Sequence, residues 1–167
     1  MKTTKIKLAL IMLVIVFASQ IYAQDKAASM VSRQMEGKYY TAIIVDTDFE
    51  TTIENVKAAL KEQGFGVVSE IDMQEKLQKG TGNDVPKYTI LGACNPDGAY
   101  QALQLEEQIG VMLPCNVIVR ETSTGQVEVA AINPQKTMQS IGNPNMIPLA
   151  AEISEKLKNV LSGLENR

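Results

Sequence analysis

Five short runs of apolar and β-branched residues alternate with segments of helical periodicity, and this alternation constrains the fold most. The runs have the length and composition of β-strands, and they lie at residues 39–46, 65–71, 88–94, 115–121 and 126–132. The first run is apolar at both odd and even positions, which predicts a strand buried largely on both faces. The last two runs are joined by Thr122-Ser123-Thr124-Gly125, a turn sequence that predicts a hairpin.

Capping residues bound the first two helices. Asp48 or Glu50 is expected to open a helix after the first strand, and Gly64 is expected to end it in the left-handed conformation. Asp72 is an N-cap candidate for a short second helix that closes near Gly80. Each of the first two strands is therefore followed by a helix.

The third helix begins at Asn95-Pro96, with asparagine as the cap and proline at the first helical position. Its inward face is expected to carry Ala99, Leu103 and Ile109. Residues 133–148 contain three prolines and are predicted to be mostly irregular. The last helix carries an apolar stripe made of Leu149, Ile153, Leu157, Val160, Leu161 and Leu164.

This order of elements predicts an α+β protein: a single compact domain with helices packed on a mixed or mostly antiparallel sheet. The expected domain covers residues 39–167, after a polar, flexible lead-in at residues 24–38. A domain of this size can bury a core without disulfides or metals.

Residues 1–23 have the pattern of a secretory signal peptide. Three lysines precede an apolar stretch at residues 8–18, and Ala23 offers a cut before Gln24. The apolar stretch is shorter than the roughly 20 residues that span a bilayer, so no stable membrane insertion is expected after cleavage. The sequence thus predicts an exported bacterial protein, periplasmic or secreted.

Charge and composition exclude several classes of function. Removal of the leader lowers the basic residues from 16 to 13 against 19 acidic residues, so the net charge falls to near −6. Such a chain is not expected to bind nucleic acid or anionic membranes. The sequence has no histidine, which excludes Ser-His-Asp and Cys-His catalysis and histidine-ligated zinc. No metal or cofactor is expected.

The two cysteines are the only thiols, and each precedes an asparagine inside an apolar run. If the strands that carry them were parallel, the thiols would lie about 20 Å apart at opposite ends of the sheet. If the strands are antiparallel, both thiols lie at the same end. The candidate site residues are Gly92, Cys94, Asn95, Cys115 and Asn116.

Three interpretations of the thiols stay open. They are small buried core residues, or they form a disulfide that closes a loop of about 20 residues and contributes roughly 3 kcal/mol. In the third, they form a functional thiol site, because Cys94 directly precedes a helix N-terminus that favours a thiolate. Asn95 and Asn116 would then donate amide hydrogen bonds to a bound group.

Four blocks of the chain resemble the DUF302 family over about residues 64–134. The blocks are Gly64-Phe65-Gly66-Val67-Val68, Ile71-Asp72, Ile90-Leu91-Gly92-Ala93-Cys94-Asn95-Pro96, and Gly110 through Met112-Leu113-Pro114-Cys115-Asn116-Val117. The resemblance implies a compact α+β domain with a TBP-like β-α-β topology, a homodimer and no assigned activity. An acid expected before Pro134 is Asn133 here. The implied topology favours antiparallel strands, so we expect the Cys-Asn residues to cluster at one sheet edge.

The function expected from these features is a non-enzymatic ligand-binding or interaction module with a site at the Cys94-Asn95/Cys115-Asn116 sheet edge. Its partner would be a second copy, a small molecule or an envelope protein. One alternative is a thiol-based redox protein or enzyme that uses Cys94 and Cys115. The other is a purely structural protein of the cell envelope.

Overall fold

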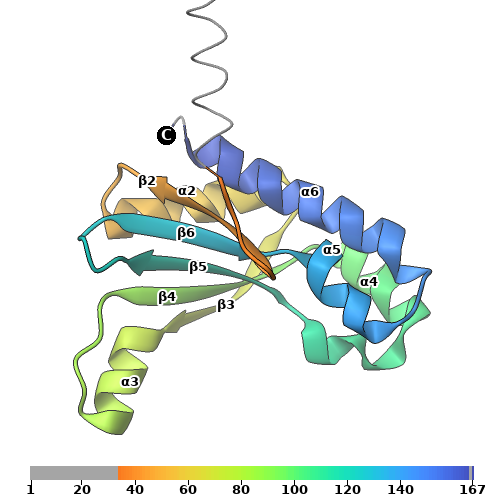
Figure 1. The fold of residues 1–167 in the computed structure, drawn as a ribbon, viewed down its shortest axis with the longest axis horizontal. Helices are drawn as coiled ribbons and strands as arrows, with labels where there is room; N and C mark the ends of the chain where they lie inside the picture. Colours follow the sequence, from red (N-terminus) through yellow and green to blue (C-terminus); the bar gives the residue numbers. More distant parts are fainter. Residues whose placement is uncertain (1–33, 166) are drawn as a thin grey trace, which may run out of the picture. The chain divides into compact units, whose positions relative to one another are not determined.

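The computed structural model of the chain describes residues 34–165 and residue 167. Helices pack on a six-stranded antiparallel sheet with strand order β1-β2-β6-β5-β4-β3 (Figure 1). The strands are β1 (Met35–Glu36), β2 (Tyr40–Val45), β3 (Gly66–Asp72), β4 (Tyr88–Cys94), β5 (Cys115–Glu121) and β6 (Val127–Ile132). The predicted α+β class, the five predicted strands and the final hairpin are confirmed.

The helices are α2 (Phe49–Glu62), α3 (Met73–Thr81), α4 (Pro96–Leu105), α5 (Pro134–Thr137) and α6 (Met146–Leu164), with 3-10 turns η1 (Glu107–Met112) and η2 (Met138–Ile141). Residues 133–148, predicted to be mostly irregular, thus hold two short helical segments and the start of α6. The Asn133 side chain begins α5 because it accepts a hydrogen bond from the backbone N–H of Lys136.

Strand β1 corrects the prediction that the chain is a flexible lead-in up to residue 38. Met35 pairs with Ala42 of β2, and the Glu36 carboxylate accepts a hydrogen bond from Thr41 at 3.0 Å. Lys136 also forms a 2.6 Å ion pair with Glu36. Thr41 and Ala42 are close to β1 in the sequence, but Lys136 is 100 residues away, and local composition does not report a contact of that range. The leader and residues 24–33 lie outside the described residues.

Local capping explains where α2 begins and ends. The Asp48 carboxylate accepts a hydrogen bond from the backbone N–H of Thr51 at 2.9 Å, as expected of an N-cap. At the other end Gly64 has a φ of +78°, and the N–H of Phe65 bonds back to the Leu60 carbonyl at 2.9 Å. This is a Schellman end, so the predicted glycine cap is confirmed.

The main core lies between the sheet and two helices. Helices α2 and α6 pack against each other on one face of the sheet, here called the covered face (Figure 1). Alternate strand residues point into this core because successive side chains of a strand point to opposite faces. Among them are Ile43, Leu91, Ala93, Val117, Val119, Val129 and Ala131.

A smaller second core lies at one end of the molecule, among α4, η1, η2 and the start of α6. Ile109 is buried there as predicted, but the prediction that Leu103 faces inward is wrong, since 44% of it is exposed. Helix α4 turns Gly98 and Ala102 toward this core instead. A Cβ on Gly98 would lie 2.7 Å from Ile153 Cδ1, so α4 and α6 approach too closely for larger side chains.

The other face of the sheet, here called the open face, has no described helix packed across its centre. Its residues are Tyr40, Ala42, Ile44, Tyr88, Ile90, Gly92, Asn116, Ile118, Arg120, Glu128, Ala130 and Ile132. The prediction that β2 is largely buried on both faces holds for Ala42, which is fully buried, but not for Tyr40 and Ile44, which are only half-buried. Both α2 and α6 lie on the covered face, while α3 projects away from the rest of the fold (Figure 1).

Candidate functional site

The two cysteines lie at the same end of neighbouring antiparallel strands. Strand β4 ends at Cys94 and β5 begins at Cys115, and Ala93 is the residue directly opposite Cys115. The antiparallel alternative is therefore the correct one. It brings the backbones of the two Cys-Asn blocks together.

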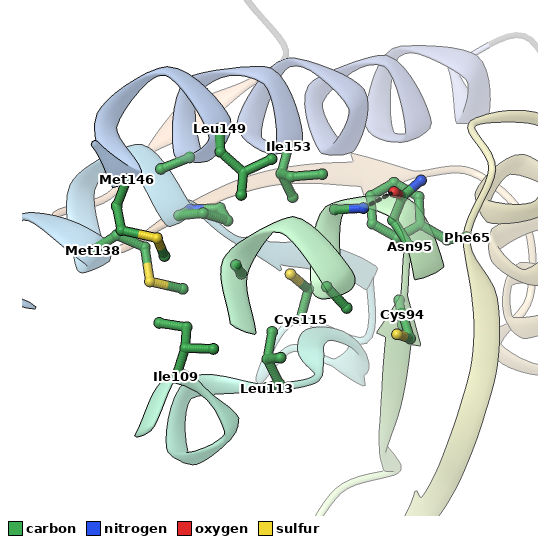
Figure 2. A pocket seen from close by; sticks show the side chains of 16 residues that line it. Phe65, Cys94, Asn95, Ile109, Leu113, Cys115, Met138, Met146, Leu149 and Ile153 are labelled. Atoms are coloured by element: carbon green, nitrogen blue, oxygen red, sulfur yellow. Dashed lines mark hydrogen bonds between the residues drawn. The ribbon is translucent and has the colours of Figure 1, made fainter. Parts of the chain in front are cut away.

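The two side chains nevertheless leave the sheet on opposite faces. Cys115 shares the covered face with Ala93, and alternation along β4 turns Cys94 the other way. Figure 2 shows the Cys115 side chain directed into a pocket and the Cys94 side chain directed away from it. Cys115 is buried, Cys94 is half-buried, and both are free thiols in the structure. Strand alternation thus separates thiols that the topology had brought close.

Asn95 connects two parts of the backbone. Its side-chain oxygen accepts a hydrogen bond from the N–H of Gly98 at 2.9 Å, which caps α4. Its amide nitrogen donates to the Gly64 carbonyl at 2.9 Å, at the end of α2. The predicted cap is confirmed, and the amide is occupied by structural hydrogen bonds.

Gly92 and Asn116 face each other across β4 and β5 on the open face. A Cβ on Gly92 would lie 2.3 Å from the Ser69 hydroxyl oxygen and 2.8 Å from Pro114 Cγ. A larger side chain at this position would collide with both neighbours, so the packing favours glycine. Asn116 is exposed beside this tightly packed point.

Burial determines the chemistry of the Cys115 thiol. Removal from water, and to a smaller extent the nearby Cys94, raises the pKa of Cys115 to about 11. Its thiol is therefore protonated at neutral pH. A thiolate is the nucleophilic form of cysteine, so Cys115 is not an activated nucleophile.

The pocket in Figure 2 is a small apolar cavity between the two cores. Its volume is about 40 Å³, well below the roughly 300 Å³ at which pockets for organic ligands begin. It therefore has room for a solvent-sized group only. Its walls are Phe65, Ala93, Cys94, Asn95, Gly98, Ala99, Ala102, Ile109, Leu113, Cys115, Pro134, Met138, Met146, Leu149, Ala150 and Ile153.

Two hollows larger than this cavity lie on the open face. One hollow of about 480 Å³ is lined by Tyr39, Tyr40, Tyr88, Asn116, Ile118, Arg120, Glu128, Ala130, Ala131 and Ile132. A second hollow of about 350 Å³ is lined by Met73, Leu77, Val85, Pro86, Tyr88, Ile90, Arg120 and Glu121. Because the two share Tyr88 and Arg120, they form one continuous surface, the open-face groove. It runs from the β1–β2 side of the sheet to α3.

One ion pair lies within the groove. Arg120 Nε lies 2.7 Å from the Glu128 carboxylate on the neighbouring strand, and this contact raises the pKa of Arg120. Burial raises the pKa of Tyr88 beside it. At the far side, the rings of Tyr39 and Tyr40 meet edge to face at 5.0 Å. The groove is thus mainly apolar and aromatic, with Arg120 and Glu128 near its centre and one further acid, Glu121, on the side of α3.

Sequence reasoning missed this groove, although the chain contained a signal for it. Tyr88, Ile90 and Ile118 alternate with buried residues of β4 and β5, so these strands are apolar on both faces. Of the five predicted site residues, only Asn116 lines the groove.

The described residues contain neither a cluster of metal ligands nor a membrane-spanning helix. Within residues 34–165 and 167, no three Cys, Asp or Glu side chains come together in a way that could hold a metal ion. None of the helices in this part of the chain is both long and apolar enough to cross a membrane.

Comparison with known proteins gives a consistent result. The family model "Domain of unknown function DUF302" matches residues 41–164. The crystal structure of an uncharacterized conserved protein DUF302 from Bacillus stearothermophilus is similar, with a TM-score of 0.72 and 27% sequence identity. The match covers 77% of this chain and 99% of that one. No curated protein matches the chain.

The family match extends beyond the resemblance seen in the sequence. It includes β2 and α2 before residue 64 and α6 after residue 134, so the whole sheet apart from β1 and all the main helices belong to it. The covered face, the open face and the groove are therefore parts of one family domain. By fold and by sequence, this chain is a member of the DUF302 family.

Proposed function

We propose that the protein is a non-enzymatic interaction module that binds a second copy of itself through the open-face groove. The observation that carries this proposal is an apolar, aromatic sheet face that no described helix covers. Tyrosine, arginine and methionine are enriched at protein interfaces, and the groove contains all three. The proposal thus retains the predicted class of function, an interaction module, but it assigns the binding site to the open face of the sheet and not to the Cys-Asn edge.

Helix α3 supports the same partner. None of its residues is buried, although Met73 and Leu77 turn apolar side chains toward the groove. An isolated helix of this length is marginal in water, and packing of its apolar side normally stabilises it. A second copy seated in the groove would cover these two side chains.

Charge and size also fit a two-fold pairing. Arg120 and Glu128 place opposite charges at the groove centre, so a two-fold axis that passes between them, across the line that joins them, would set each against its opposite in the other copy. Five strands spaced by about 4.8 Å and about 20 Å long present roughly 500 Å² of sheet. With α3 added, this approaches the roughly 800 Å² per partner of a standard interface.

The thiol-enzyme alternative has less support. It needs a reactive thiolate, whereas the Cys115 thiol is protonated at neutral pH and the two side chains leave the sheet on opposite faces. The chain also has no histidine to act as a base.

Sedimentation velocity of the purified protein tests the proposal. The wild type should sediment as a dimer at micromolar concentration, and Arg120→Glu should weaken association at least tenfold by placing acids together. The double variant Arg120→Glu/Glu128→Arg restores opposite charges and should recover the dimer. Lys57→Glu, which breaks an ion pair with Glu70 outside the groove, is the matched control. A wild type that is monomeric at 100 μM would refute the proposal.

We also propose that the protein acts after export, with residues 1–23 removed. This rests on the leader pattern alone, since those residues lie outside the described part of the chain. N-terminal sequencing of protein recovered from the periplasm or medium should begin at Gln24. Recovery only from the cytoplasm, with Met1 in place, would contradict it.

A further inference from the structure

A second apolar surface lies at the end of the molecule formed by α4, η1 and the start of α6. Four large apolar side chains are exposed there: Val111 at 86%, Tyr100 at 66%, Ile147 at 56% and Leu103 at 44%. We call these four residues the end patch. Exposed apolar residues gathered on neighbouring elements indicate an interaction site more often than single ones do.

The fold brings these residues to one end. Tyr100 and Leu103 are three positions apart on α4, so they lie side by side on its outer face. Val111 is in η1, which packs on α4, and the Asn143 amide just before α6 donates to the Leu105 carbonyl at 2.9 Å. Figure 1 shows α4, the turn that follows it and the start of α6 at the same end of the molecule.

Helix α4 has an unusual distribution of side chains for a surface helix. An amphipathic helix normally buries its larger apolar residues. Here Gly98 and Ala102 face the core, while Leu103 and Tyr100 face solvent. Packing within the chain leaves this outer side without a partner, so a second molecule that covers it would remove apolar area from water.

The segment that carries Tyr100, Leu103 and Val111 has charges of one sign only. Between Lys87 and Arg120 the charged residues are Asp97, Glu106 and Glu107. None of these three forms an ion pair with another described residue, whereas acids elsewhere, such as Glu128, do. The patch is therefore apolar and flanked by uncompensated negative charge.

We propose that the end patch docks a basic segment of a partner protein that presents an apolar face. The four exposed side chains supply the apolar contact, and the three acids attract lysine or arginine at its rim. The same acids repel an anionic membrane surface, which excludes the main alternative for an exposed apolar patch. The patch belongs to the helical end and the groove to the open sheet face, so this inference does not depend on the proposed dimer.

The probe is a synthetic 18-residue amphipathic peptide made of leucine and lysine, titrated into the purified protein and followed by calorimetry. The wild type should bind it, and higher salt should weaken binding because opposite charges are screened. Leu103→Ser/Val111→Ser should raise Kd at least tenfold. Glu106→Gln/Glu107→Gln should raise Kd severalfold at low salt and flatten the salt dependence.

The matched control is Val68→Ser, which removes an equally exposed apolar side chain on β3 and should leave Kd within twofold of wild type. Thermal unfolding checks that each variant is folded, and sedimentation checks that the dimer is unaffected. Equal affinity of the wild type and the Leu103→Ser/Val111→Ser variant would overturn the proposal. So would equal binding of a leucine and glutamate peptide of the same pattern.

Discussion

The covered face and the open face of the sheet are made by the same strands, yet their surroundings differ. On the covered face, residues such as Val117 and Val119 are fully buried by α2 and α6. On the open face, their immediate neighbours Ile118 and Arg120 are half-buried and line a groove. An apolar residue in a strand therefore favours burial, but the described helices bury only one face of the sheet.

Truncation on the covered side should have the largest effect. Leu161 of α6 is fully buried between the helix and the sheet. Leu161→Ala should lower the free energy of unfolding by about 2–5 kcal/mol, because it removes buried methyl groups and leaves a cavity. Urea unfolding measures this loss. Leu103→Ala, on the solvent side of α4, is the control; an equal loss there would mean that α4 faces the other way.

The point of closest packing on the open side comes next. Gly92→Ala should cost about 1–3 kcal/mol, since its Cβ would overlap Ser69 and the ring of Pro114. Ser69→Ala in the same chain should recover part of that loss by clearing one of the two contacts. Gly66→Ala, where nothing lies within 4 Å, should cost much less. A neutral Gly92→Ala would show that β3 and β4 separate more easily than this geometry indicates.

The buried Cys115 thiol should make the stability of the protein depend on pH. Burial raises the pKa of Cys115 to about 11, so above pH 9 the unfolded chain loses this proton while the folded chain keeps it. The stability that Cys115 contributes is therefore complete below pH 8 and lost as pH rises toward 11. Between pH 8 and pH 10 the loss should be about 1 kcal/mol. Urea unfolding of Cys115→Ala should lack this part of the pH dependence. The same slope in the variant would assign it to other groups.

The two asparagines should differ by a smaller amount. Asn95→Ala removes the α4 cap and the bond to the Gly64 carbonyl, at a cost of about 1–2 kcal/mol. Asn116 is exposed on the open face, so Asn116→Ala should stay within about 0.5 kcal/mol. Thermal unfolding of the pair gives the difference directly. Equal costs would mean that Asn116 holds a structural contact of its own.

A small effect on the folded monomer should also come from the apolar side chains of the open face. At concentrations where the protein is a monomer, Ile118→Ala should cost less than about 1 kcal/mol, because the side chain is only half-buried. At concentrations where the dimer forms, the same substitution should cost more, since the partner would bury it. A cost that does not change with protein concentration would argue against pairing through this face.

Much of the local structure could be predicted from residues that act on their near neighbours. Asp48 and Asn95 cap helices through hydrogen bonds three residues away, and Gly64 ends α2 because it adopts a positive φ. The prediction that Leu103 faces inward was wrong because its orientation depends on a contact between residues that are far apart in the sequence. The close approach of α6 at Gly98 decides which side of α4 faces the core, and that contact joins residues 55 positions apart.

The candidate site could likewise be predicted only in part. The sequence correctly placed the two Cys-Asn blocks at one end of adjacent strands. It could not separate their side chains, because the face of each residue depends on the register between β4 and β5. That register sends Cys115 into the cavity, turns Cys94 away from it and leaves Asn116 on the open face. The groove escaped prediction because it combines residues from four strands and α3.

By itself, the sequence determined the five longer strands, the four main helices, the caps of α2 and α4, the α+β class and the absence of histidine chemistry, since each follows from composition or from contacts within a few residues. Only the tertiary structure showed which face of the sheet is covered and that Met35 and Glu36 form an edge strand. It also showed that the two cysteine side chains point to opposite faces of the sheet. The physical reason is that strand pairing and helix packing join residues far apart in the chain, and a period of two assigns side chains to faces without saying what covers either.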